Sequence, residues 1–313
     1  MKDNQVKGKK YTVNSTQYTV RGIQYFNFLV KFSNPRDVKI VLENKRVWWW
    51  NVLWIAWQLW RGVPVAKIIN KKWFYGLPFY TNRHTLDPRP DSETLVEAVL
   101  ANEKNSARIL DLGTGTGCLL CAILKNLPNA TGVGIDKSRR ALSVAKRNIR
   151  ALGLSDRAVA VCGKFSMFSQ KLRSNFCHPC EGMDRALNRN AKHCRYKNFK
   201  DPVPAFAGMT KKCKAFFCEK YFDIIISNPP YIAVGDVVDR GARHDPKTAL
   251  YSGADGLKFY HEIAMIRSDA KLYLEIGAGQ EKAVRKIFTD AAWRFISKHK
   301  DLSGRVRVLV FSR

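Results

Sequence analysis

The run Asp111-Leu112-Gly113-Thr114-Gly115-Thr116-Gly117 stands between a short apolar segment and a longer segment with helical periodicity. Glycines at such a junction let the backbone turn sharply and approach a ligand closely. We therefore predict a strand over residues 108–112, a helix over residues 118–126, and a ligand-binding turn between them.

Strand and helix patterns keep alternating after this turn. Such alternation predicts a mostly parallel sheet covered by helices on both faces, with any ligand beyond the carboxyl ends of the strands. The expected fold class is α/β, with a Rossmann-like seven-stranded sheet. The further predicted strands cover residues 131–135, 158–162, 222–227 and 271–276, two short strands end near Phe311, and the further helices cover 138–152, 256–268 and 280–291.

The amino-terminal part has a different pattern. Residues 1–20 show little periodicity and are expected to form a loose start, whereas apolar residues recur at helical spacing over residues 25–70. The most apolar stretch, residues 47–60, is shorter than the ~20 residues of a membrane helix, so we predict a core-facing helix and no membrane segment. We expect a small helical domain over residues 1–84 and the α/β domain over residues 85–313.

The charge of the chain is unusually positive. Its 313 residues carry a formal net charge of +28, while 46% hydrophobic residues exclude wholesale disorder. Residues 1–90 hold 16 basic and 4 acidic residues, and residues 171–220 hold 12 basic and 4 acidic ones. This excess favours a weak attraction to nucleic acid or ribosomes. The polar first thirty residues and eight cysteines without a secretory signal indicate reduced thiols and a cytoplasmic protein.

Residues 171–218 interrupt the strand and helix alternation. They contain Cys177-His178-Pro179-Cys180, a spacing that zinc sites use. Because a second regular pair is missing, we assign no metal and predict a basic inserted loop.

Acidic residues stand at the ends of the first two predicted strands. Asp136 can accept hydrogen bonds from both ribose hydroxyls of a nucleoside. Asp111 suits a ligand with a cationic amino acid part, such as S-adenosyl-L-methionine. The candidate residues for binding this cofactor are Asp111, Gly113, Thr114, Gly115, Thr116, Gly117 and Asp136.

Asn228-Pro229-Pro230-Tyr231 directly follows the strand predicted over residues 222–227. The two prolines fix the backbone, so that the Asn228 side chain and the Pro229 carbonyl face one small target. Their oxygens can accept both hydrogens of a planar NH2 group, and Tyr231 can pack on its π-system. Such a nitrogen is a poor nucleophile, so alignment with a sulfonium methyl group is the expected source of catalysis. We predict that these four residues form the catalytic site of an N-methyltransferase and that Asn228 also contacts the cofactor.

Together, these motifs resemble the HemK/PrmC family of peptide chain release factor N5-glutamine methyltransferases. The likeness runs from about residue 61 to the carboxyl terminus, apart from the insertion. Asn-Pro-Pro-Tyr by itself is shared with DNA amino methylases. The resemblance to the glutamine methyltransferases is more specific in the linker Pro88-Arg89-Pro90-Asp91-Ser92-Glu93. Further matching stretches are Phe74-Tyr75-Gly76-Leu77, Thr248-Ala249-Leu250, Asp255-Gly256-Leu257, Leu274-Glu275-Ile276-Gly277 and Asp301-Leu302-Ser303-Gly304-Arg305.

The resemblance implies a class I S-adenosylmethionine-dependent methyltransferase whose amino-terminal helical domain docks the release factor. It implies that residues 113–117 and Asp136 hold the cofactor, and that residues 228–231 grip the glutamine of the Gly-Gly-Gln motif in class 1 peptide chain release factors. Phe165 is expected to stack on adenine, next to Lys164, where the family has an acidic residue.

Two alternative functions stay open. A DNA or RNA amino methyltransferase, acting on N6 of adenine or N4 of cytosine, would suit the net charge, although no helix-turn-helix or RNA-binding motif is visible. A decayed, inactive homologue is the second alternative, suggested by Lys164, by the insertion and by the absence of the family's turn before Lys271.

Overall fold

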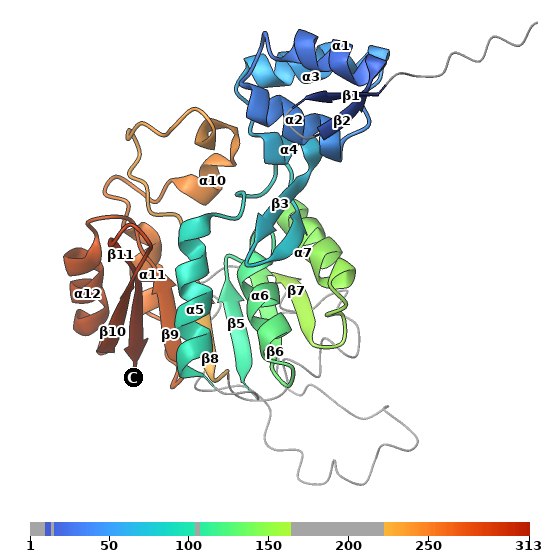
Figure 1. Ribbon diagram of the computed structural model, residues 1–313. Coiled ribbons are helices and arrows are strands. Elements are labelled where there is room, and N and C mark those ends of the chain that lie inside the picture. The colour runs from blue at the N-terminus through green and yellow to red at the C-terminus, as the bar shows by residue number, and fades with distance from the viewer. Residues whose placement is uncertain (1–9, 14–15, 104–106, 164–221) are drawn as a thin grey trace, which may run out of the picture.

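The computed structural model describes residues 10–13, 16–103, 107–163 and 222–313 (Figure 1). The predicted insertion and the predicted adenine-stacking residue Phe165, with its neighbour Lys164, lie outside these residues.

A seven-stranded sheet forms the centre of the molecule, in the order β10-β11-β9-β8-β5-β6-β7. Five neighbouring strands run parallel, from β9 through β8, β5 and β6 to β7, and β11 and β10 extend the sheet in antiparallel fashion. The α/β class and the seven-stranded Rossmann-like sheet are thereby confirmed. The strands are β5 (Arg108–Leu112), β6 (Thr131–Asp136), β7 (Ala158–Cys162), β8 (Ile224–Ser227), β9 (Lys271–Glu275), β10 (Arg294–Lys300) and β11 (Val306–Ser312).

Helices cover both faces of this sheet, and a hydrophobic core fills each interface. Successive residues of β5 point to opposite faces, so Ile109 packs in the core beneath α5, α6 and α7, whereas Leu110 packs in the core beneath α11 and α12. All four residues of β8 are buried, as expected of a central parallel strand. The helices are α5 (Glu93–Asn102), α6 (Cys118–Asn126), α7 (Arg139–Ala151), α11 (Lys258–Ala264) and α12 (Glu281–Asp290).

The amino-terminal part forms a helical unit that lies above the sheet in Figure 1. Asn34 caps α2 by accepting a hydrogen bond from the backbone N–H of Asp37 at 2.9 Å. The helical prediction for residues 25–70 is confirmed. The elements are α1 (Val20–Leu29), α2 (Pro35–Asn44), α3 (Trp49–Trp60) and α4 (Val65–Ile69), followed by the hairpin of β3 (Lys71–Phe74) and β4 (Leu77–Tyr80).

The loose start predicted for residues 1–20 is wrong where the structure describes it. Lys10–Val13 (β1) and Thr16–Thr19 (β2) pair as an antiparallel ribbon. Threonine, valine and tyrosine dominate both segments, and these residues favour extended backbone even without a regular polar and apolar alternation.

The core-facing helix predicted over residues 47–60 is buried on one face only. Val52, Ile55, Ala56 and Leu59 pack in the core of the helical unit. The opposite face exposes the large side chains of Trp48, Trp49, Trp50, Leu53, Trp54, Trp57 and Trp60. Among the described residues, none of the helices combines the length and the apolarity that crossing a membrane requires.

Candidate active site

Three neighbouring strands bring the predicted site residues to one edge of the sheet. Leu112 of β5 pairs with Ile135 of β6 on one side and with Ser227 of β8 on the other. The glycine turn, Asp136 and Asn228 each follow one of these paired residues. Because the strands are parallel, all three groups emerge at the same edge. The sheet therefore gathers the candidate cofactor turn and the candidate catalytic motif.

The glycine turn has a backbone that glycine adopts readily. Gly113, Gly115 and Gly117 have φ values of 77°, 53° and 78°. The backbone N–H groups of Gly113 and Thr114 both donate to the Ile135 carbonyl, at 2.8 and 2.9 Å. A Cβ atom on Gly115 would meet only the Gly113 carbonyl oxygen, at 3.8 Å. The turn is thus anchored to β6 and keeps one open side where a ligand can approach the backbone.

Asp111 lies buried beneath this turn. Its Oδ2 atom accepts a hydrogen bond from the Thr114 hydroxyl at 2.6 Å, whereas its buried Oδ1 atom has no hydrogen-bond partner among the described residues. Burial raises the pKa of Asp111 to about 7, against the opposing effect of the Thr114 bond. A buried carboxylate oxygen without a partner fits a cationic ligand group, such as the ammonium of S-adenosyl-L-methionine.

Asp136 is held in place by two backbone donors. Its Oδ1 accepts from the N–H of Ser138 at 2.8 Å and its Oδ2 from the N–H of Gly115 at 3.0 Å. Burial raises the pKa of Asp136, and these two hydrogen bonds oppose the rise. A carboxylate offers about four acceptor positions, so two bonds leave capacity for the ribose hydroxyls that the sequence predicts as partners.

Binding of S-adenosyl-L-methionine near neutral pH is expected to release up to about one proton. With a pKa of about 7, Asp111 is partly protonated in the free protein, and a neighbouring cation favours the ionised form. Calorimetric binding enthalpies in buffers of different ionisation enthalpy measure this release. The Asp111→Asn variant should lose it, and equal enthalpies for the wild-type chain in all buffers would contradict the assignment.

Asn228 connects the candidate catalytic motif, residues 228–231, with the proline-rich linker. Its Nδ2 group donates a hydrogen bond to the Oγ atom of Ser92 at 3.0 Å. Ser92 ends the short 3-10 helix η1 (Pro90–Ser92) and is buried. The Ser227 hydroxyl, one residue before Asn228, donates to the Leu112 carbonyl at 2.8 Å and ties β8 to β5. Pro229 is buried, and Pro230 and Tyr231 are half-buried.

Two residues that sequence reasoning gave no role support this motif. Gln280 donates from Nε2 to the Tyr231 carbonyl at 3.0 Å. Glu275 ends β9 and is buried, which raises its pKa to about 7, while hydrogen bonds with the Ser92 and Asn228 side chains lower it. Glu275 and Ser92 both stand in stretches that carry the family resemblance. An acidic residue at the carboxyl end of the strand beside β8 is the signal that could have identified Glu275.

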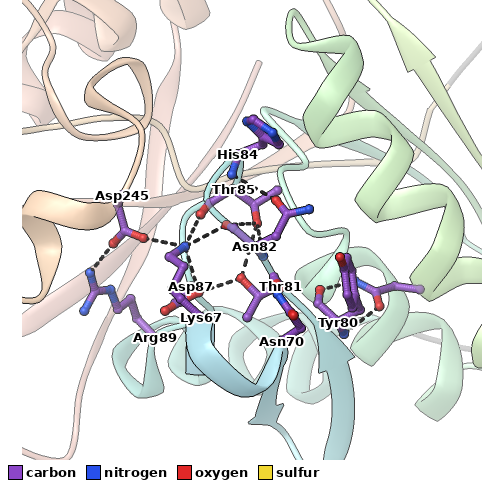
Figure 2. Close-up of polar contacts among 11 residues, drawn as sticks. Lys67, Asn70, Tyr80, Thr81, Asn82, His84, Thr85, Asp87, Arg89 and Asp245 are labelled. Atoms are coloured by element: carbon purple, nitrogen blue, oxygen red, sulfur yellow. Dashed lines mark hydrogen bonds and ion pairs between the residues drawn. The ribbon is translucent and has the colours of Figure 1, made fainter. Parts of the chain in front are cut away.

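A buried ion-pair network joins the helical unit to the loop that follows the catalytic motif. Lys67 of α4 pairs with Asp87 at 2.9 Å and with Asp245 at 2.8 Å, and it also donates to the carbonyls of Asn82 and Thr85 (Figure 2). Asp245 pairs in turn with Arg89 at 2.8 Å. Sequence reasoning missed this network, which connects α4, the linker and the loop.

The same loop contacts the helical unit directly. His244, in the short helix η4 (Ala242–His244), lies with its Nε2 atom 3.2 Å from the Arg61 carbonyl oxygen, and Arg240 donates to the Trp60 carbonyl. After η4 the loop continues into α10 (Lys247–Leu250). The backbone N–H of Ile232, directly after the catalytic motif, donates to the Leu250 carbonyl at 3.0 Å. Both ends of the loop are therefore fixed at the residue after the Asn-Pro-Pro-Tyr motif, and residues in its middle contact the helical unit.

The strand order, the glycine turn after the first parallel strand and the acid after the second define a Rossmann-like class I S-adenosylmethionine-dependent methyltransferase. Residues 103–194 match the family model described as a methyltransferase domain. The release factor glutamine methyltransferase of Rhodospirillum rubrum is 36% identical over 259 residues, a match that covers 80% of this chain and 65% of that protein. The chain belongs to the release factor glutamine methyltransferase family, as two further relatives show, each of which it covers to about three quarters of its length.

Two further relatives carry the same name. The protein of Agrobacterium fabrum is 34% identical over 266 residues, which cover 80% of this chain and 75% of that protein. The protein of Enterococcus faecalis is 30% identical over 263 residues, which cover 81% of this chain and 77% of that protein. The match thus spans slightly less than two thirds of the Rhodospirillum rubrum protein and about three quarters of the other two.

Proposed function

We propose that this chain methylates the side-chain amide nitrogen (N5) of the glutamine in the Gly-Gly-Gln motif of class 1 peptide chain release factors, with S-adenosyl-L-methionine as methyl donor. The observation that carries this proposal is the position of Asn228, which emerges beside the glycine turn at the carboxyl edge of the sheet. The names of the curated relatives support the same substrate.

The proposed catalytic role of this chain is alignment. S-adenosyl-L-methionine supplies a methyl group on a sulfonium sulfur, a strong electrophile. The Asn228 Oδ1 and Pro229 carbonyl oxygens are proposed to accept the two hydrogens of the substrate carboxamide, while Tyr231 packs against its plane. Holding a delocalised nitrogen lone pair in line can contribute roughly 7 to 11 kcal/mol in the best cases. The amide proton can leave after transfer, so the site needs no dedicated general base.

The cofactor is proposed to bind over the glycine turn, with Asp111 beneath it and Asp136 beside it. Stacking of Phe165 on adenine stays a prediction, since that residue lies outside the described part of the chain.

The domain roles are also part of this proposal. We assign residues 1–84 to a domain that docks the release factor, and residues 85–313 to the methyltransferase domain, interrupted by a basic insertion at about residues 171–218. A cytoplasmic location is consistent with Cys118, Cys121 and Cys162, which are free thiols. Weak attraction of the basic segments to nucleic acid or ribosomes stays a prediction.

Neither alternative function is favoured. The curated relatives named above are glutamine methyltransferases, which favours neither a DNA or RNA amino methyltransferase nor a decayed homologue. The glycine turn, Asp136 and the Asn-Pro-Pro-Tyr motif emerge at one edge of the sheet, which supports an active enzyme.

The proposal is tested by incubating the chain with methyl-labelled S-adenosyl-L-methionine and either a class 1 release factor or DNA. We expect label on the glutamine of the Gly-Gly-Gln peptide, located by mass spectrometry, and none on DNA. A release factor with alanine in place of that glutamine is the matched control. Label on DNA with an unmodified glutamine would overturn the proposal in favour of the nucleic-acid enzyme.

A further inference from the structure

Three polar side chains form a hydrogen-bonded chain behind the catalytic motif. Asn228 donates from Nδ2 to the Ser92 Oγ atom at 3.0 Å, and both side chains lie close enough to the Glu275 carboxylate to lower its pKa by hydrogen bonding. Register explains part of this arrangement, because Ser227 of β8 pairs with Leu274 of β9. Asn228 and Glu275 each follow one member of that pair, and the linker carries Ser92 to the same place.

This set of three hydrogen-bonded side chains is buried at one end and accessible at the other. Ser92 is 2% exposed and Glu275 is 1% exposed, whereas Asn228 is half-buried. Asn228 is therefore the most accessible of the three side chains, and Glu275 and Ser92 lie behind it.

The charge of Glu275 fixes the direction of these hydrogen bonds. Above about pH 7, the pKa to which burial raises Glu275, its carboxylate is mostly ionised and has acceptors only, so the Ser92 hydroxyl and the Asn228 amide group must both donate. The amide nitrogen of Asn228 then faces inward, and its Oδ1 atom is left as an acceptor. With the carboxamide turned over, an NH2 group would instead face the NH2 group of a glutamine substrate, and two donors would oppose each other.

We propose that Glu275 and Ser92 are positioning residues that hold the Asn228 carboxamide with its Oδ1 atom towards the substrate nitrogen. This inference rests on the proposed function, because it assigns a direction to the contact between Asn228 and a substrate amide. It adds two residues to a site whose motif alone leaves the orientation of the carboxamide open.

A purely structural role explains the arrangement less well. The Glu275 Oε2 atom is buried without a hydrogen-bond partner among the described residues. The nearby Arg307 directs its NH2 group to Asp301 at 3.2 Å and to Asp91 at 2.9 Å. A buried carboxylate with an unused oxygen costs stability, and glutamine would fill the same volume without a charge. A role that requires hydrogen-bond acceptors and no donors explains why this residue is a glutamate and not a glutamine.

The decisive variant is Glu275→Gln. A glutamine amide can donate to Ser92, which allows the whole chain of hydrogen bonds to reverse and the Asn228 carboxamide to turn over. We expect kcat for methylation of the release factor to fall roughly 10- to 100-fold, as small misplacements in an active site do. The KM for the release factor and the affinity for S-adenosyl-L-methionine should stay within about twofold. The melting temperature should equal or exceed that of the wild-type chain.

Companion variants separate positioning from folding. Ser92→Ala should lower kcat like Glu275→Gln, and Ser92→Thr, which keeps the hydroxyl, should restore most of it. Glu103→Gln is the matched control: Glu103 is also largely buried, but it pairs with Lys271 at the start of β9, at the opposite end of the strand from Glu275. An unchanged kcat in Glu275→Gln, or a rise in KM alone, would overturn the proposal.

An NMR measurement that does not depend on catalytic activity distinguishes the failure of the positioning role from the failure of the proposed function. The side-chain NH2 signals of Asn228 in a ¹H–¹⁵N spectrum, assigned by their absence in Asn228→Ala, should shift in Glu275→Gln and stay in place in Glu103→Gln. If the wild-type chain leaves the release factor unmethylated, the proposed function fails while these signals still report on the hydrogen-bonded chain. Identical Asn228 signals in wild type and Glu275→Gln would refute the positioning role by itself.

Discussion

Replacing Asn228 with alanine is expected to lower kcat for methylation of the release factor roughly 100- to 1000-fold. The substitution removes the one side-chain oxygen that the motif offers to the substrate NH2 group. It leaves the glycine turn, Asp111 and Asp136 untouched, because none of the hydrogen bonds that hold them involves Asn228. Affinity for S-adenosyl-L-methionine should therefore stay within a few-fold of wild type.

Single-turnover kinetics with labelled cofactor, together with calorimetric binding of S-adenosyl-L-methionine, measure both quantities. Asn126→Ala is the matched control, since the Asn126 side chain donates to the Ala122 carbonyl at 2.9 Å, in the last turn of α6 and at the opposite end of that helix from the glycine turn. That control should retain full activity. Full activity of Asn228→Ala would remove the residue from its proposed role, and a joint loss of activity and cofactor binding would move it to the cofactor site.

The α/β part of the fold could be predicted from sequence because its central strands are buried on both faces. Such strands appear as short apolar runs between turn residues, and the bounds predicted for β5, α6 and β7 agree with the structure. The helix predicted over residues 256–268 differs most, since α11 covers only Lys258–Ala264. The two final strands, predicted to be short, have seven residues each. The next two residues after α11, Met265 and Ile266, are apolar and extend the helical pattern in the sequence, although the helix ends at Ala264 and Ile266 packs in the core beneath α11 and α12.

The amphipathic helix α3 shows a different limit. Its tryptophans count as apolar in any periodicity argument, so the segment looks core-facing on every side. Trp49 is nevertheless 72% exposed and Trp60 is 62% exposed, because only one stripe of the helix reaches the core of the helical unit. Local pattern gives the helix, but the face that packs is set by its neighbours α1 and α4.

The candidate site divides in the same way. Motif residues at strand ends could be located, because parallel register alone carries them to one edge of the sheet. The residues that support them could not be located from the sequence. Ser92 and Asn228 are hydrogen-bonded although they are 136 positions apart, and Gln280 and Tyr231 although they are 49 positions apart. No local pattern encodes a hydrogen bond between such distant residues, so the orientation of Asn228 emerges only from the assembled fold.

The Lys67→Met variant is expected to lower the free energy of unfolding by about 3 to 5 kcal/mol. Lys67 is the shared cation of Asp87 and Asp245, and the side chains of these three residues are only 5%, 8% and 1% exposed. Removing the ammonium leaves two buried carboxylates close to each other, of which only Asp245 retains a cation, at Arg89. Chemical denaturation followed by circular dichroism measures the loss.

The control is Lys286→Met, which removes an ion pair with Asp290 whose side chains are 75% and 61% exposed and should cost less than about 1 kcal/mol. Adding Asp87→Asn and Asp245→Asn to Lys67→Met should recover part of the stability, because the penalty comes from unpaired buried charge. A loss of stability in Lys67→Met no larger than in Lys286→Met would contradict a stabilising role of the network.

Because Asp245 lies on the loop anchored to the catalytic motif, kcat should also fall in Lys67→Met at temperatures where the chain is still folded. The ion pairs would then stabilise the fold and also hold the helical unit against the loop that follows the substrate-binding motif.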